Sequence, residues 1–449
     1  MQDKFKTQLM KLLTLDWLNG DMSDPERFIS KLFLGLISLL PIIAIFSHRT
    51  FGPALYIAMI ICAFLSPSWS GYRQYFLQPI LKGKAFHGYD RLTHSALLLF
   101  TLWTMMTLAW TPISGRFALT SGLFFIALAG GTIIWHSVRL PKAIKSQLAD
   151  IYAIAIIIAL VVLGFETLTG GFIRAIVPPT DDSLERHKDL IALARGTTAM
   201  MVMIFPAMII THLRTGLKWP LLVIFVIAGV SAYGLGVSAN LLGLIGGCFA
   251  GLIAWRWPST TIACLFVLLG VCLWIMPLVA INLSPEMLAQ LSGAEFSNHK
   301  VPTSWLQRLY IWESLGQEIP NAMPLGQGVD YTRWLSRNSG LFEVPGVSGV
   351  LKLVPTHPHN VFLQIWLELG VVGAVIVSTL LYGGGKWVLS KGFSRPLMTA
   401  LAGIMAASLV SFLIEASFWQ VWRLAAIVFA CFGLALLSGE AEPSKPIDY

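Results

Sequence analysis

Residues 260–281 read TTIACLFVLLGVCLWIMPLVAI and contain no charged side chain. A helix of about 20 apolar residues crosses the hydrocarbon core of a bilayer, so this stretch predicts a membrane span. Of the 449 residues, 56% are hydrophobic and 12% are charged. That charged share is roughly half of what a soluble domain carries, and the mean hydropathy is +0.72. The composition therefore excludes a water-soluble multidomain enzyme.

Eleven further apolar runs, separated by polar turns, have the composition of membrane helices. They are residues 28–46, 51–65, 95–110, 117–135, 151–168, 197–210, 221–234, 238–255, 360–382, 397–413 and 421–437. The sequence therefore predicts an all-α, polytopic integral membrane protein with about twelve transmembrane helices.

The distribution of Lys and Arg predicts the orientation of these helices. The connections on one side hold eighteen basic residues, and the shorter connections on the other side hold six. Basic residues accumulate on the cytoplasmic side of a membrane, so we expect both termini in the cytoplasm. Because the basic residues are scattered and form no stripe, we expect no nucleic-acid partner.

Two segments on the opposite, external side are long enough to carry chemistry. They are residues 169–196 and 282–359, and the second divides the chain into spans one to nine (1–281), a large loop (282–359) and spans ten to twelve (360–449). Long connections are uncommon unless they are functional, so the external face is where we expect the site.

The large loop contains one predicted helix, residues 304–319. At 100° per residue, Arg308 lies on an apolar face that it shares with Trp305, Leu309, Trp312, Leu315, Gly316 and Ile319. An arginine on the apolar side of a helix lying against a membrane domain is either paired with a neighbour or extended to water. Alternatively, it is held in place to bind an anionic substrate such as a diphosphate.

The large loop ends in PTHPHN, residues 355–360, and runs directly into the tenth span. Pro358 restricts the turn and Asn360 is a good helix cap, so His359 is fixed at the mouth of a membrane helix. A histidine there is a candidate general base, or simply an interfacial hydrogen-bonding group. His357 and His359 have no third ligand at metal-site spacing, so we expect no metal.

Further charged residues stand near the ends of spans. We expect Arg195 at the start of the sixth span, where unpaired N–H groups also attract anions, although an interfacial anchor is the alternative. Glu415 and Arg423 flank the last short external turn and are predicted to pair. In the tenth span, Glu368 either lines a cavity with Gln364 or pairs with a neighbouring helix.

Three short motifs follow one another in a fixed order along this external side. They are Arg308 with Trp312, the stretch PLGQG at 324–328, and His359-Asn360 followed by Gly370 and Gly373. In order, spacing and topological side, the chain resembles the O-antigen ligase family of the wider O-antigen ligase/polymerase superfamily. The resemblance implies a GT-C-like architecture with a large periplasmic loop between spans nine and ten.

The resemblance also implies an activity. It is that of an inverting, metal-independent and cofactor-free glycosyltransferase of the bacterial inner membrane, with its active site facing the periplasm. The implied donor is a glycan on undecaprenyl diphosphate, and the implied acceptor is lipid A–core. The catalytic pair would be His359, which takes the acceptor proton, and Arg308, which binds the diphosphate together with Arg195.

Three more residues, His357, Asn360 and Tyr310, would orient the histidine or the acceptor. An O-antigen polymerase of the same superfamily is the nearest alternative. Polymerases often show an arginine-x10-glycine pattern, which is missing here because Pro206 and Ile319 occupy the glycine positions. A twelve-span secondary transporter fits less well, because the long loop follows the ninth span and not the sixth.

Overall fold

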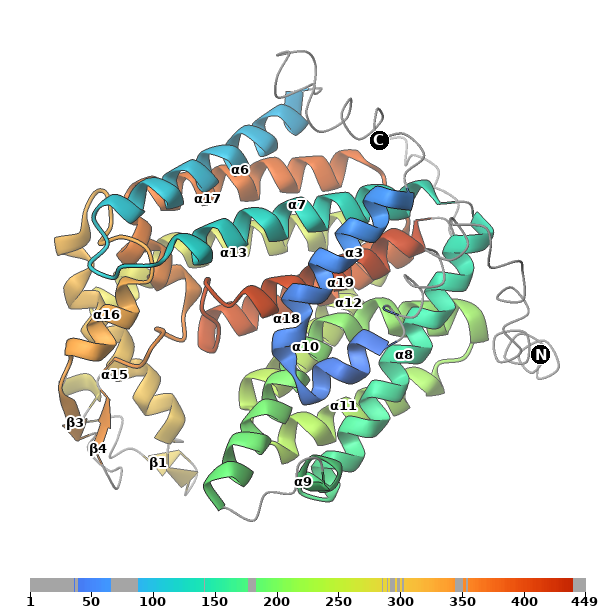
Figure 1. The fold of residues 1–449 in the computed structure, drawn as a ribbon, viewed down its shortest axis with the longest axis horizontal. Helices are drawn as coiled ribbons and strands as arrows, with labels where there is room; N and C mark the ends of the chain where they lie inside the picture. The colour runs from blue at the N-terminus through green and yellow to red at the C-terminus, as the bar shows by residue number, and fades with distance from the viewer. Residues whose placement is uncertain are drawn as a thin grey trace.

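The computed structural model describes most of the chain as a bundle of long helices (Figure 1). The described residues are 36, 39–65, 88–140, 142–176, 183–284, 286–288, 290, 295–296, 299–300, 303–343, 350–352 and 354–438. The basic N-terminal segment, most of the predicted first span and the connection at 66–87 lie outside them.

The bundle helices keep the predicted order along the sequence. They are α3 (Phe51–Leu65), α6 (Gly88–Met106), α7 (Phe117–Arg139), α8 (Lys142–Leu168), α10 (Ser183–Thr215), α11 (Trp219–Gly234), α12 (Ser238–Arg256), α13 (Pro258–Ile281), α17 (Val361–Ser390), α18 (Arg395–Ile414) and α19 (Val421–Leu437). Within the described residues, eight helices are long and apolar enough to cross a membrane, and α11 and α19 are shorter apolar helices. The structure therefore confirms the all-helical, polytopic membrane class.

Small residues bring α12 and α18 close together. Gly243 lies against the backbone of Ala407, and a Cβ on Gly247 would stand 2.9 Å from the carbonyl oxygen of Gly403. Spaced glycines let membrane helices approach through van der Waals contact, which is their main source of association energy in lipid.

One helix boundary differs from the prediction. We expected the sixth span to start at residue 197, but α10 begins at Ser183 and contains Arg195 well inside. The predicted span was limited to apolar residues. In the structure, the polar residues that precede Arg195 are helical too and extend α10 toward its N-terminus. Arg195 is therefore not at a helix N-terminus, and the argument from unpaired N–H groups was wrong.

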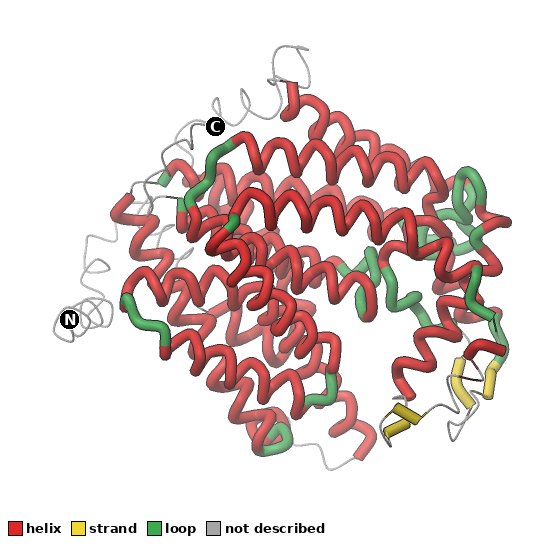
Figure 2. Tube along the Cα trace, turned by 180° about the vertical axis from the view of Figure 1, so that it is seen from behind, coloured by secondary structure: helices red, strands yellow, loops and turns green. Residues whose placement is uncertain are grey.

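The large loop folds into short elements beside the bundle (Figures 1 and 2). These are α15 (Thr303–Glu318), η5 (Pro320–Ala322), α16 (Tyr331–Asn338) and two antiparallel hairpins, β1 (Glu295–Phe296) with β2 (His299–Lys300) and β3 (Leu341–Glu343) with β4 (Val350–Lys352). We call the end of the bundle where they lie the loop end. The sequence predicted α15 but neither α16 nor the hairpins.

The predicted face of α15 is confirmed in part. Leu315, Gly316 and Ile319 are buried as predicted, whereas Trp305 is 46% exposed, and the unpredicted Leu306 and Ile311 are buried. A tryptophan is stable where one edge of the ring is apolar and the other wet, so its size did not mark the packed face. Gly316 instead sets the docking, because a Cβ there would lie 2.3 Å from the carbonyl oxygen of Ala280 on α13.

Helix α17 is interrupted at Gly370, which has φ 67° and ψ −165°. The loop around Gly326 and Gly328 fills the interruption, since Gln327 N donates to Leu367 O at 2.9 Å and Gly328 N donates to Glu368 O at 2.9 Å. The two glycine motifs therefore contact each other, and each needs its glycine because the backbones touch. Gly326 and Gly328 both have positive φ, a conformation that glycine adopts without strain.

We predict that Gly326→Ala destabilises the protein by about 3 kcal/mol or more, through overpacking and left-handed strain together. The new Cβ would lie 2.4 Å from the carbonyl oxygen of Glu368. Gly340→Ala is the matched control, because no atom lies within 4 Å of the place that a Cβ on Gly340 would occupy. Thermal unfolding in detergent measures both. Equal unfolding temperatures for the two variants would contradict the packing of the loop into the broken helix.

Candidate active site

His359 lies at the loop end, directly before α17. Asn360 caps this helix as expected, since its Oδ1 accepts a hydrogen bond from Leu363 N at 3.1 Å. His359 itself has φ 53°, an uncommon conformation for a residue other than glycine. The rings of His357 and His359 lie side by side, with centroids 4.4 Å apart. The turn therefore presents both histidines together at the start of the helix.

Glu415, at the end of α18, is the residue that the predicted site residues meet. The Glu415 backbone lies close enough to the His359 ring to raise its pKa, and Arg308 Nε donates to the adjacent carbonyl of Ile414 at 2.6 Å. The predicted pair of Glu415 and Arg423 is confirmed, with Oε1 and Nη2 3.2 Å apart. Arg308 and His359, which are distant in sequence, are thus joined through one turn.

Arg195 reaches the same region from α10. One turn further along this helix, Thr198 Oγ1 lies 3.4 Å from Glu415 Oε1. The Arg195 guanidinium is close enough to lower the pKa of His357. Its side chain is exposed, so it can still take an anionic partner. The structure therefore brings Arg195, Arg308, His357, His359 and Asn360 to one end of the bundle.

Burial and positive neighbours keep both histidines neutral. Burial, followed by the nearby Arg308 guanidinium, lowers the pKa of His359 to about 4, although Glu415 acts in the opposite direction. Burial, followed by the His359 ring, lowers the pKa of His357 to about 3. The buried Nδ1 of His359 has no hydrogen-bond partner among the described residues. A neutral imidazole with one free nitrogen is able to accept a proton from a ligand.

The remaining candidate, Tyr310, and the two arginines of α16, Arg333 and Arg337, lie in the large loop. Tyr310 is buried on the packed side of α15, two residues after Arg308, and burial raises its pKa. Arg333 Nε donates to Asp330 Oδ2 at 2.9 Å, whereas Arg337 is exposed. Within the described residues, no group of three or more His, Cys, Asp or Glu side chains is placed to hold a metal ion.

Sequence reasoning missed a further set of basic residues beside Arg195. His48, in the turn η2 (His48–Thr50), is buried and packs edge-on against Trp422, with ring centroids 4.9 Å apart. Burial, followed by Arg195, Arg49, Arg174 and Arg423 in that order, lowers its pKa to about 4. Arg49 and Arg174 stand in connections that the charge count predicted to be external, and this was the available signal in the sequence. The loop end is therefore strongly positive, which favours an anionic ligand.

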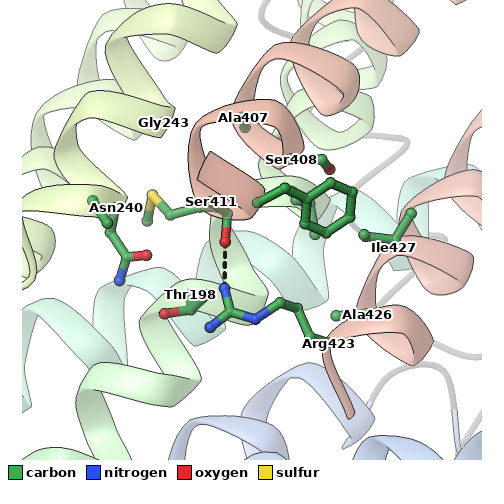
Figure 3. A pocket seen from close by; sticks show the side chains of 13 residues that line it. Thr198, Asn240, Gly243, Ala407, Ser408, Ser411, Arg423, Ala426 and Ile427 are labelled. Atoms are coloured by element: carbon green, nitrogen blue, oxygen red, sulfur yellow. Dashed lines mark hydrogen bonds between the residues drawn. The ribbon is translucent and has the colours of Figure 1, made fainter. Parts of the chain in front are cut away.

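A cavity between α10, α12, α18 and α19 adjoins this positive region (Figure 3). The Arg423 guanidinium points to Ser411 and donates to its Oγ, and Thr198 lies beside it. Ala407 and Gly243 line the cavity on its apolar side. Arg423 thus lies between an apolar cavity and the Glu415 carboxylate.

Comparison with known proteins supports the family resemblance. Residues 221–378 match the model of the O-antigen ligase family, a range that holds α15, the glycine motifs and His359. A protein of Rickettsia felis named "Putative polysaccharide ligase" is 23% identical over 384 residues, covering 84% of this chain and 88% of its own length. A similarly named Rickettsia conorii protein is 24% identical over 77% of this chain and 80% of its own. The chain is thus similar to the O-antigen ligase family over the part that carries the candidate site, as the sequence motifs predicted, and to proteins named polysaccharide ligases over most of its length.

Proposed function

We propose that the protein transfers a glycan from undecaprenyl diphosphate to lipid A–core at the periplasmic face of the bacterial inner membrane. The similarity to O-antigen ligases and polysaccharide ligases supports a polysaccharide ligase in general. One structural observation supports the more specific donor, acceptor and membrane face. This is the meeting of His359, Arg308 and Arg195 around the turn that begins at Glu415. A neutral base and several arginines at one end of a membrane bundle suit a lipid diphosphate donor and a hydroxyl acceptor.

The arginines would bind the leaving group. A glycosyl diphosphate already has a good leaving group, so the protein must chiefly stabilise the negative charge that develops on it. Arg195 offers an exposed guanidinium. Arg308 uses Nε and Nη1 to bind the carbonyls of Ile414 and Ser304, each at 2.6 Å. These bonds fix the plane of the Arg308 guanidinium and leave Nη2 for the diphosphate.

His359 would act as the general base. Its free Nδ1 takes the proton of the acceptor hydroxyl, and that oxygen attacks the anomeric carbon from the face opposite the diphosphate. The bond between the anomeric carbon and the diphosphate oxygen breaks, and the electron pair leaves with the diphosphate. The new glycosidic bond has inverted configuration. Asn360, His357 and Tyr310 would hold the base and the acceptor in position.

The lowered pKa of His359 predicts a specific pH dependence. The base works when neutral, so kcat/KM should stay flat from about pH 8 down to about pH 6 and fall only toward the pKa of about 4. A bound diphosphate adds negative charge, which favours the protonated ring and raises its pKa. The acid limb of kcat should therefore lie at higher pH than that of kcat/KM. Coincident limbs would contradict an anion bound beside His359.

A deletion strain separates the proposed ligase from a polymerase. If the protein is the ligase, cells without it accumulate polymer on the lipid carrier, and their lipid A–core carries no glycan. If it is a polymerase of the same superfamily, the core carries a single repeat unit. Electrophoresis of lipopolysaccharide, with separate extraction of the lipid-linked polymer, distinguishes these results.

A further inference from the structure

Glu368 is a fully buried carboxylate that binds two separate segments. In α17 it accepts hydrogen bonds from Asp330 N at 2.8 Å, Thr332 N at 3.1 Å and Thr332 Oγ1 at 2.6 Å. It also accepts from the indole Nε1 of Trp419. Of the two alternatives from sequence, the structure favours pairing with a neighbouring helix, because Thr332 belongs to α16.

Gln364 lies one helical turn before Glu368 and completes the contact. Its Oε1 accepts from Phe418 N at 2.8 Å and from Ser417 Oγ at 3.1 Å, and its Nε2 donates to Glu368 Oε1 at 3.2 Å. Residues 417–419 belong to the turn between α18 and α19. The two side chains therefore hold this turn against α17 at three adjacent residues.

The turn held in this way is the one that carries Glu415. His359 lies just before α17, five residues before Gln364, and the Glu415 backbone lies close enough to its ring to raise its pKa. At its other end, the turn meets Arg423 through Gln420, whose Oε1 accepts from Arg423 Nε at 2.9 Å. The distance between His359 and the turn is therefore set along α17 by Gln364 and Glu368.

From these contacts we infer that Gln364 and Glu368 are positioning residues, which hold the 415–420 turn so that Glu415 orients His359 for proton transfer. This inference rests on the proposed function. Neither residue touches substrate, and both act through His359. Buried side chains that accept several hydrogen bonds fix geometry to fractions of an ångström, and a misplacement of about 1 Å at a reacting group costs up to about a hundredfold in rate.

The test compares contacts on the two sides of Glu368. Trp419→Phe and Ser417→Ala each remove one donor on the turn side, and Gln364→Leu removes the acceptor. Thr332→Val removes the hydroxyl donor on the loop side. Ser378→Ala is the control: it removes the acceptor for Trp274 Nε1 at 2.9 Å, a contact of α17 away from the turn.

Each variant is purified, and kcat and donor KM are measured for transfer from a lipid diphosphate donor, together with the unfolding temperature. We expect Trp419→Phe and Gln364→Leu to lower kcat about tenfold, and Ser417→Ala a few-fold, with donor KM within about threefold. Thr332→Val and Ser378→Ala should keep kcat within about twofold. In the turn-side variants, the acid limb of kcat should move to lower pH, because Glu415, which raises the pKa of His359, is held less closely to the ring.

Two results would overturn the inference alone. One is transfer that is lost on His359→Ala but unchanged in Trp419→Phe and Ser417→Ala. The other is a Thr332→Val variant that loses as much kcat as Trp419→Phe at equal unfolding temperature. A parent protein without any transfer activity would overturn the proposed function and this inference with it. If Gln364→Leu does not accumulate in membranes, the kcat values of Trp419→Phe and Ser417→Ala test the inference.

Discussion

Replacing His359 by alanine is expected to lower kcat for glycan transfer about a thousandfold, with the protein still present in the membrane. The reason is that Nδ1 of this neutral ring is the free acceptor at the site. His359→Asn is the sharper variant. Asparagine tolerates the left-handed backbone that His359 adopts at φ 53°, so the turn is retained while the base is removed.

His212→Ala is the matched control, because His212 lies at the opposite end of α10 and its Nδ1 contacts Leu217 O at 3.2 Å. It should keep full activity. Transfer is measured in cells by lipopolysaccharide electrophoresis and in detergent by single-turnover kinetics. Full transfer by His359→Asn at parent expression would remove the proposed base.

Replacing Arg308 by alanine is expected to lower kcat about a hundredfold or more, in the range seen when one charge-stabilising donor is lost. Arg308→Lys should recover little of it. The guanidinium binds the Ile414 and Ser304 carbonyls with two different nitrogens, and a lysine ammonium lacks that planar geometry. The loss should appear mainly in kcat, since charge on the leaving diphosphate develops in the transition state.

Arg337→Ala serves as the control for Arg308, because Arg337 is an exposed arginine of the same loop. Its removal should change kcat less than about twofold. Arg308→Ala also removes the hydrogen bond to Ile414. Its unfolding temperature shows whether the loss of kcat comes from a destabilised fold. A lysine variant with parent kcat would mean that charge alone is needed, and would argue against the fixed guanidinium plane.

The membrane helices were largely predictable because each is an apolar run bounded by polar turns. The bounds of α3 and α19 agree with the predicted runs, and α13 ends at the predicted Ile281. The start of α10 was not predictable in this way, because its first turns are polar and helical propensity continues past the membrane. On α15, Gly316 was assigned to the correct face and docks against α13, whereas Trp305 was wrongly placed on it and is exposed.

The candidate site was predictable in part. His359 and Arg308 stood out because charged or titratable groups are few and lay in conspicuous places. Their meeting at Glu415 was hidden, because Arg308 and Ile414 are separated by 106 positions. Contacts between distant segments leave no local pattern in one sequence. The same reason explains why the alternatives for Glu368, a cavity or a neighbouring helix, stayed open, while its donors come from the loop and the last turn.

The most direct measurement is transfer by the purified protein from a glycan on undecaprenyl diphosphate to purified lipid A–core, in EDTA without added divalent metal. We predict that glycan becomes attached to the core and undecaprenyl diphosphate is released in equal amount, and that His359→Asn abolishes both. Elongated glycan that stays on the lipid carrier, with the core left bare, would contradict the proposed ligase.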